Sequence, residues 1–168
     1  MNILYCGDKP MQKGILLSSM SLIKNVDEPL NIYILTVDYR EKGINYKPVD
    51  KAFAKYLKEK LNKSDIKVNI FLVDVTRYFV EELPEANMQS RFTACCMLRL
   101  FADKTDIKDR VLYLDTDVLC RKDFRDFYYQ NMDGISYYRY VDDILILVNE
   151  EKFFEIKKEI AKDIDELG

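Results

Sequence analysis

Apolar and polar residues follow one another along this chain in a pattern that predicts strands and helices in turn. Short apolar runs rich in Ile, Val and Tyr and bounded by Gly, Pro or Asp are typical of buried strands. Longer segments with apolar residues three or four positions apart are typical of helices. The expected strands are residues 3–6, 31–37, 68–75 and 110–119, and the expected helices are residues 13–24, 49–61 and 93–102. This alternation predicts an α/β fold with a mainly parallel sheet and helices on both faces.

Composition narrows the class of protein. The chain has 168 residues, of which 48% are hydrophobic and 33% charged, which suits a globular domain with its own core. No apolar run approaches the roughly 20 residues that span a bilayer, so no membrane span is expected. The net charge of -3 gives no basic surface for a phosphate backbone, so a nucleic-acid partner is not expected.

The cysteines and the missing histidine exclude several kinds of site. Four cysteines stand at positions 6, 95, 96 and 120 without a C-x-x-C pair, which argues against a zinc site and for reduced thiols in the cytoplasm. The chain contains no histidine. That absence excludes Ser-His-Asp triads, Cys-His pairs and H-E-x-x-H zinc sites.

The tripeptide Asp115-Thr116-Asp117 follows the apolar run of residues 111–114. On an extended backbone, two carboxylates one residue apart point to the same side, and a strand ending there carries both to the edge of the sheet. Hard divalent cations take carboxylate oxygens and share their other positions with water and substrate phosphates. The tripeptide therefore predicts Mg²⁺ or Mn²⁺ holding a diphosphate. The alternative is that the aspartates only end the strand or begin a turn.

Gly7 and Asp8 end the first expected strand and so belong to the same carboxyl edge of the sheet. A carboxylate there can accept a hydrogen bond from a base or a ribose. The chain has no G-x-G-x-x-G sequence, so a dinucleotide-binding loop is not predicted. The alternative is that Asp8 is a turn or helix-cap residue.

Four stretches carry a family resemblance: N-I-L-Y-C-G-D at the start, S-S-M-S-L-I-K-N in the first helix, M-L-R-L-F-A-D-K, and D-R-V-L-Y-L-D-T-D-V-L. With them, residues 1 to about 134 resemble the N-terminal half of the family-8 glycosyltransferases. The resemblance implies a Rossmann-like nucleotide-diphospho-sugar transferase fold of the GT-A type. It implies that Asp117 ligates Mn²⁺ (or Mg²⁺) and that Asp115 contacts the metal or the donor ribose, which makes both catalytic. It also implies that Gly7 and Asp8 contact the uracil or its ribose and that Arg99 neutralises charge on the donor side. An ordinary surface position is the alternative for Arg99.

The implied function is metal-dependent transfer of a sugar from a UDP-sugar donor to a saccharide, lipid-saccharide or protein acceptor. The family takes a further metal ligand, a histidine, and its acceptor-binding groups from its C-terminal half. This chain has no histidine and is expected to be truncated before that region. Donor binding without transfer is therefore an alternative to complete catalysis.

The tail carries a second resemblance. Residues 137–148, Y-Y-R-Y-V-D-D-I-L-I-L-V, are similar to the palm motif of reverse transcriptases, in which a pair matching Asp142 and Asp143 helps to hold two metals. Residues 150–167 are amphipathic and predict a helix. We therefore expect residues 1–134 to form the nucleotide-sugar-binding domain and residues 135–168 a separate hairpin-helix tail, a fused or misjoined fragment. Nucleotidyl transfer is the alternative function, and a purely structural hairpin the alternative for the tail.

Overall fold

The computed structural model describes residues 1–62, 65–82, 94–107, 110–129, 135–140 and 143–148. They belong to two compact units, Met1–Tyr128 and Tyr129–Gly168. Each unit is described by itself.

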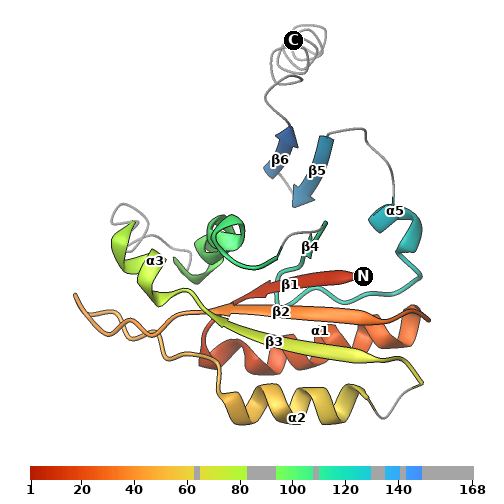
Figure 1. Cartoon of the computed structure of the whole chain (residues 1–168), viewed down its shortest axis with the longest axis horizontal. Helices are drawn as coiled ribbons and strands as arrows, with labels where there is room; N and C mark the ends of the chain where they lie inside the picture. Colours follow the sequence, from red (N-terminus) through yellow and green to blue (C-terminus); the bar gives the residue numbers. More distant parts are fainter. Residues whose placement is uncertain (63–64, 83–93, 108–109, 130–134, 141–142, 149–168) are drawn as a thin grey trace, which may run out of the picture. The chain divides into compact units, whose positions relative to one another are not determined.

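The first unit is built on a parallel sheet of four strands (Figure 1). The strands are β1 (Asn2–Cys6), β2 (Leu30–Thr36), β3 (Val68–Asp74) and β4 (Leu112–Tyr113). Their order is β3-β2-β1-β4, and every neighbouring pair is parallel. The chain first adds strands on one side of β1 and then returns to add β4 on the other side. The order of the strands therefore reverses beside β1.

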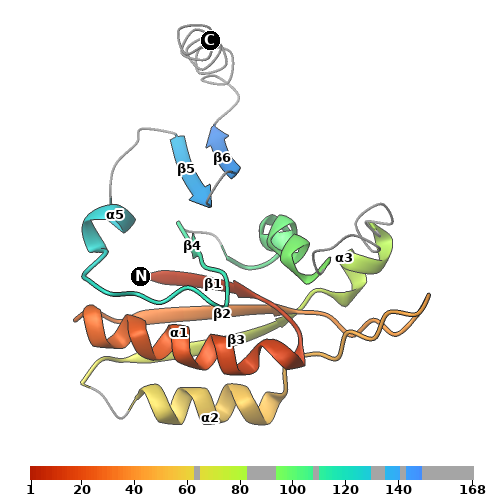
Figure 2. The ribbon, with the colours of Figure 1, turned by 180° about the vertical axis from the view of Figure 1, so that it is seen from behind.

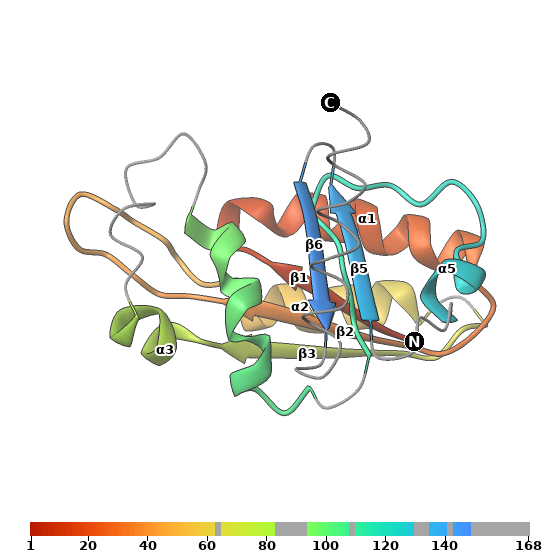
Figure 3. The same cartoon turned by 90° about the horizontal axis from the view of Figure 1, so that it is seen from above.

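Helices cover both faces of this sheet, as the sequence predicts. Helices α1 (Gln12–Asn25) and α2 (Lys51–Leu61) lie on one face, which Figure 2 shows in front. The opposite face carries α3 (Thr76–Glu81) and a 3-10 helix, η2 (Ala94–Lys104), whose green ribbon crosses over the strands in Figure 3. The described part of the chain also contains two short helices: η1 (Lys9–Met11) and α5 (Arg125–Tyr129), whose last residue falls in the second unit.

Alternating residues of the central strands pack into two cores. On the α1 side, Ile3, Tyr5 and Ile32 are fully buried, and on the η2 side Leu4 and Leu35 are buried. Successive side chains of a strand point to opposite faces, so a strand buried on both faces must be apolar throughout. This requirement explains the uninterrupted apolar run of β1.

Two expected elements differ from the observed ones. The expected strand over residues 110–119 pairs with β1 only at Leu112 and Tyr113, because residues 115–118 form a turn closed by the Val118 N–H donating to the Asp115 carbonyl at 3.1 Å. The expected helix over residues 93–102 is the 3-10 helix η2. Apolar spacing does not distinguish a 3-10 helix from an α-helix over so short a segment.

Three asparagines join the strands near the amino edge of the sheet. Asn2, Asn31 and Asn69 face one another in the register of β1, β2 and β3. The Asn69 amide donates to Asn31 Oδ1 at 2.9 Å, and the Asn31 amide donates to Asn2 Oδ1 at 3.0 Å. The Asn2 amide continues the row by donating to the Arg110 carbonyl at 3.1 Å. We call this row the asparagine ladder. It fixes the register of three strands at the edge opposite the carboxyl ends.

Removing the central member of the asparagine ladder is expected to destabilise the fold. Asn31→Ala breaks two side-chain hydrogen bonds between half-buried groups, so it should lower the free energy of unfolding by about 1–2 kcal/mol. Urea denaturation followed by circular dichroism measures this loss. Asn69→Ala removes one of the two bonds and should cost less, so an equal loss in both variants would contradict the ladder's role.

The second unit contains an antiparallel hairpin of β5 (Ile135–Tyr140) and β6 (Asp143–Val148). The hairpin expected for the tail is therefore confirmed. Asp143 is the first residue of β6 and pairs with Tyr140. Asp142 and the helix expected over residues 150–167 lie outside the described residues, so the reverse-transcriptase resemblance stays a prediction.

The described helices can be checked for the ability to cross a membrane. None of these described helices combines the length and the apolar character that crossing a bilayer requires.

Candidate functional site

The site is built where β1 and β4 end side by side. Ile3 pairs with Leu112 and Leu4 with Tyr113, and the Leu114 N–H continues the contact by donating to the Leu4 carbonyl at 2.9 Å. Asp8 and Asp115 each follow the last residue of their strand by two positions. In open α/β sheets, ligands bind outside the carboxyl ends of strands at the point where the strand order reverses. The two acidic segments flank that point.

Asp8 is buried without acting as a helix cap. Its side chain is only 7% exposed and makes no capping hydrogen bond to η1, which begins at the next residue. Its backbone carbonyl accepts the turn hydrogen bond from the Met11 N–H at 3.0 Å. Burial raises the pKa of the Asp8 carboxyl, and a hydrogen bond from its own backbone N–H opposes this shift. Gly7 holds the end of β1 by donating its N–H to the Leu35 carbonyl at 3.0 Å.

Asp115 and Asp117 occupy a turn and not the extended strand that their spacing predicts. Asp115 begins the turn and is half-buried, whereas Asp117 is exposed. The two carboxylates therefore have different surroundings. We call residues 115–118 the aspartate turn.

Tyr113 and Arg99 orient Asp115. The Tyr113 hydroxyl donates to Asp115 Oδ1 at 2.5 Å, and the Arg99 guanidinium lies 5.1 Å from the centre of the Tyr113 ring. Burial raises the pKa of Tyr113, and the hydrogen bond to Asp115 raises it further, so the hydroxyl keeps its proton. Arg99 is half-buried on η2 and reaches Asp115 by way of this ring. Tyr113 was not among the site residues expected from the sequence, although a residue two positions before Asp115 on the expected strand lies on the same side as Asp115.

Helix α1 contacts the aspartate turn and the segment that follows it. A Cβ atom placed on Gly14 would lie 2.5 Å from the Thr116 carbonyl oxygen. Farther along α1, Ser21 Oγ accepts from the Cys120 N–H at 2.8 Å, and the Asn25 amide donates to the Cys120 carbonyl at 3.0 Å. Gly14 was not among the residues expected to matter, although an isolated glycine inside a helical pattern is the signal that points to such a close approach.

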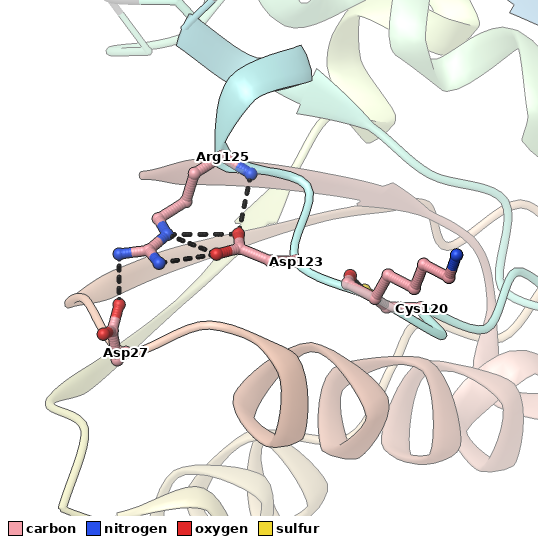
Figure 4. Close-up of polar contacts among 5 residues, drawn as sticks. Asp27, Cys120, Asp123 and Arg125 are labelled. Atoms are coloured by element: carbon pink, nitrogen blue, oxygen red, sulfur yellow. Dashed lines mark hydrogen bonds and ion pairs between the residues drawn. The ribbon is translucent and has the colours of Figure 1, made fainter.

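An ion-pair cluster holds the chain after Cys120 (Figure 4). The Asp123 carboxylate accepts from the Arg125 backbone N–H at 2.9 Å and pairs with the Arg125 guanidinium at 2.5 Å. The same guanidinium reaches Asp27, in the loop between α1 and β2. Hydrogen bonding to Arg125 lowers the pKa of Asp123, so this carboxylate stays charged. The cluster fastens the start of α5 beside the end of α1.

The carboxylates suit a metal that is shared with a ligand. Among the residues that the structure describes, no group of three or more His, Cys, Asp or Glu side chains is placed to hold a metal ion. Mg²⁺ and related hard cations are commonly bound by one or two carboxylates together with substrate phosphates and water. The aspartate turn offers two carboxylates of this kind, the half-buried one of Asp115 and the exposed one of Asp117. These two carboxylates do not supply a complete set of metal ligands, so the remaining positions would be filled by the ligand and water.

Solved structures share this fold. The galactosyltransferase LgtC in complex with donor and acceptor sugar analogues superposes with a TM-score of 0.64 at 16% identity, over 100% of this chain and 66% of LgtC. The Q189E mutant of LgtC gives the same score over 97% of this chain and 64% of that one. The glycosyltransferase GlyE of Streptococcus pneumoniae matches with a TM-score of 0.56 at 18% identity, over 98% of this chain and 38% of GlyE. The chain thus spans less than two thirds of the length of each, and the likeness shows the GT-A-like fold.

Sequence comparison identifies the family. No curated protein sequence matches this chain. The family model described as glycosyl transferase family 8 matches residues 2–166, and so includes the tail as well as the parallel sheet. The sequence resemblance ended near residue 134, whereas the family match continues to residue 166. A match over nearly the whole length, on a chain with the GT-A-like fold, shows that the protein belongs to glycosyl transferase family 8.

Proposed function

We propose that the chain binds a UDP-sugar together with Mn²⁺ or Mg²⁺ and transfers the sugar to an acceptor. The observation that carries this proposal is the convergence of Asp8 and the aspartate turn on the adjacent carboxyl ends of β1 and β4. A nucleoside diphosphate has a neutral base and ribose at one end and a charged diphosphate at the other. A buried hydrogen-bond acceptor beside an acidic, metal-attracting turn complements both ends.

Each site residue has a role in this proposal. Asp8, following Gly7, accepts a hydrogen bond from the uracil or the ribose in a place shielded from water. Asp117 offers an exposed carboxylate to the metal. One carboxylate oxygen of Asp115 accepts the hydrogen bond from Tyr113, and the other binds the metal or the ribose. Arg99 keeps a positive charge beside this acidic turn and limits repulsion between the carboxylates and the diphosphate.

The transfer exchanges one bond of the sugar for another. The bond between the sugar C1 and the diphosphate oxygen breaks, a bond forms between C1 and an acceptor hydroxyl oxygen, and the proton of that hydroxyl is released to water. The bound metal would neutralise the charge that develops on the leaving diphosphate. The proposed acceptor is a saccharide, a lipid-linked saccharide or a protein. The cytoplasm is the proposed location, which the four free cysteines support.

Titration calorimetry tests the donor site. UDP with Mn²⁺ should bind, and ADP with Mn²⁺ should bind at least tenfold more weakly if Asp8 contacts the base, because the two nucleotides share the ribose and differ only in the base. Equal affinities for UDP and ADP would contradict a contact of Asp8 with the base. Incubating a UDP-sugar with the protein and measuring the UDP released, with and without saccharide acceptors, then separates transfer from donor binding alone.

Replacing Asp8 should weaken nucleotide binding without removing its dependence on the metal. Asp8→Ala deletes a buried acceptor, so we expect the Kd for UDP to rise at least tenfold, which corresponds to about 1.4 kcal/mol. Titrations with and without Mn²⁺ measure both properties. Asp38→Ala removes an exposed carboxylate after β2 and is the matched control. Loss of the Mn²⁺ dependence in Asp8→Ala would place the metal at Asp8 and contradict the division of roles.

A further inference from the structure

One face of helix α1 contacts the aspartate turn at Thr116 and the chain beyond it at Cys120. Gly14, Ser21 and Asn25 follow one another at intervals of seven and four residues, which places them on one side of an α-helix. Gly14 meets Thr116 inside the turn, while Ser21 and Asn25 meet Cys120. We call these three residues the turn-facing side of α1. The start of this side of α1 thus contacts the aspartate turn, and its end binds Cys120.

Gly14 makes the closest of these contacts. Glycine inside a helix is unfavourable compared with alanine, so its presence in the first turn of α1 calls for a physical reason. The reason is the Thr116 backbone: a Cβ on residue 14 would lie 2.5 Å from its carbonyl oxygen and 3.1 Å from its carbonyl carbon. The shorter distance is roughly 1 Å below ordinary non-bonded separations. Backbone atoms cannot rotate away as a side chain does, so any side chain at residue 14 must displace the turn.

The other end of the segment is fixed by hydrogen bonds. The Cys120 N–H donates to Ser21 Oγ, and the Cys120 carbonyl accepts from the Asn25 amide. Ser21 Oγ also donates to the Ser18 carbonyl at 2.6 Å, which sets the direction of its lone pairs toward Cys120. Both backbone groups of one residue are thereby satisfied by α1. The segment cannot slide along the helix without losing both bonds.

We propose that the turn-facing side of α1 is the positioning element of the donor site, with Gly14 setting the separation between Asp8 and the aspartate turn. This inference rests on the proposed donor function. Asp8 lies six residues before Gly14 and is joined to it by η1 and the first turn of α1. In its bound conformation, UDP holds its base and its diphosphate at one distance from each other, and the two halves of the site must lie at the same distance. A ligand that bridges both groups is therefore sensitive to the Gly14–Thr116 contact, since misplacement of about 1 Å can cost a hundredfold in a preorganised site.

Gly14→Ala gives the first test. The Kd for UDP with Mn²⁺ should rise at least tenfold, whereas the Kd for uridine, which has no diphosphate and needs no metal, should change less than threefold. Val68→Ala is the control for lost stability, because Val68 is buried in β3 away from the carboxyl ends. That variant should leave both Kd values unchanged. A Gly14→Ala protein with unchanged affinity for UDP, or with equal losses for UDP and uridine, would overturn the proposal.

Hydrogen exchange gives a second test that needs no ligand. In Gly14→Ala, the Val118 N–H, which closes the aspartate turn, should exchange at least tenfold faster, while amides of β2 and β3 keep their protection. Ser21→Ala adds no volume and should speed exchange of the Cys120 N–H, and Ser21→Thr, which keeps the hydroxyl, should restore it. Unchanged exchange at both amides would refute the positioning role. If the unsubstituted protein binds no UDP, the donor function fails, and the exchange rates still decide whether α1 holds the turn.

Discussion

Replacing both carboxylates of the aspartate turn should nearly abolish metal-dependent donor binding. In Asp115→Asn/Asp117→Asn the side chains keep their shape and lose both negative charges that a hard cation requires. We expect the Kd for UDP with Mn²⁺ to rise at least a hundredfold, about 2.7 kcal/mol, and the single change Asp117→Asn to raise it at least tenfold. Titration calorimetry at fixed ionic strength measures each variant.

The control must separate ligand loss from a change in net charge. Asp103→Asn/Asp126→Asn removes the same two charges from exposed positions on η2 and α5. Its affinity for UDP with Mn²⁺ should equal that of the unsubstituted protein. If the aspartate-turn variant also bound UDP with unchanged affinity and Mn²⁺ dependence, the metal would not be held by Asp115 and Asp117.

The buried hydroxyl of Tyr5 should make the fold sensitive to alkali. Tyr5 is fully buried beneath α1, and its hydroxyl lies 2.7 Å from Ser18 Oγ. Burial raises the pKa of Tyr5 to about 12, and the hydrogen bond with Ser18 opposes this shift. An exposed tyrosine of the unfolded chain ionises near pH 10, so above that pH the unfolded state loses a proton that the folded state keeps. The contribution of Tyr5 to the free energy of unfolding is therefore fully present below about pH 10. It should fall by about 2 kcal/mol as the pH rises to 12.

Tyr5→Phe isolates this effect, because the ring remains and the ionisable group is removed. Urea denaturation at several pH values should give a shallower loss of stability for Tyr5→Phe than for the unsubstituted protein between pH 9 and pH 12. Cys6, whose pKa burial also raises, contributes a fall of the same sign in both proteins. Identical slopes for the two proteins would mean that Tyr5 is accessible to hydroxide before unfolding.

The regular part of the fold could be predicted from the spacing of apolar residues. The first three strands and first two helices were expected within two residues of their observed ends, because each has a long apolar run or a clear helical face. The strand over residues 110–119 was wrong in extent for a physical reason. Val118 and Leu119 continue the apolar pattern, but the backbone of this segment bonds to a turn and to α1 side chains in place of β1.

The acidic residues of the candidate site could be identified from the sequence, whereas the residues that support them could not. Asp8, Asp115 and Asp117 stood out because acidic residues directly follow apolar strands. The sequence offers only weak signals for Tyr113 and Gly14, namely a tyrosine two positions before Asp115 and a lone glycine in a helical pattern. The contacts themselves depend on burial for Tyr113 and on a segment far away in sequence for Gly14. The asparagine ladder likewise depends on the register of three strands, which a single sequence does not specify.

The pairing of β4 with β1 has a consequence for the order in which the protein assembles. Only Leu112 and Tyr113 of β4 pair with β1. Forming this pairing closes a loop that contains nearly the whole first unit, and loop closure costs conformational entropy. The first three strands and two helices, with their shorter crossovers, gain most of the buried surface before that closure. The segment bearing Asp115 and Asp117 should therefore dock last during folding and open first under denaturant. A ligand that contacts both Asp8 and the aspartate turn would therefore stabilise the docked position of this last segment.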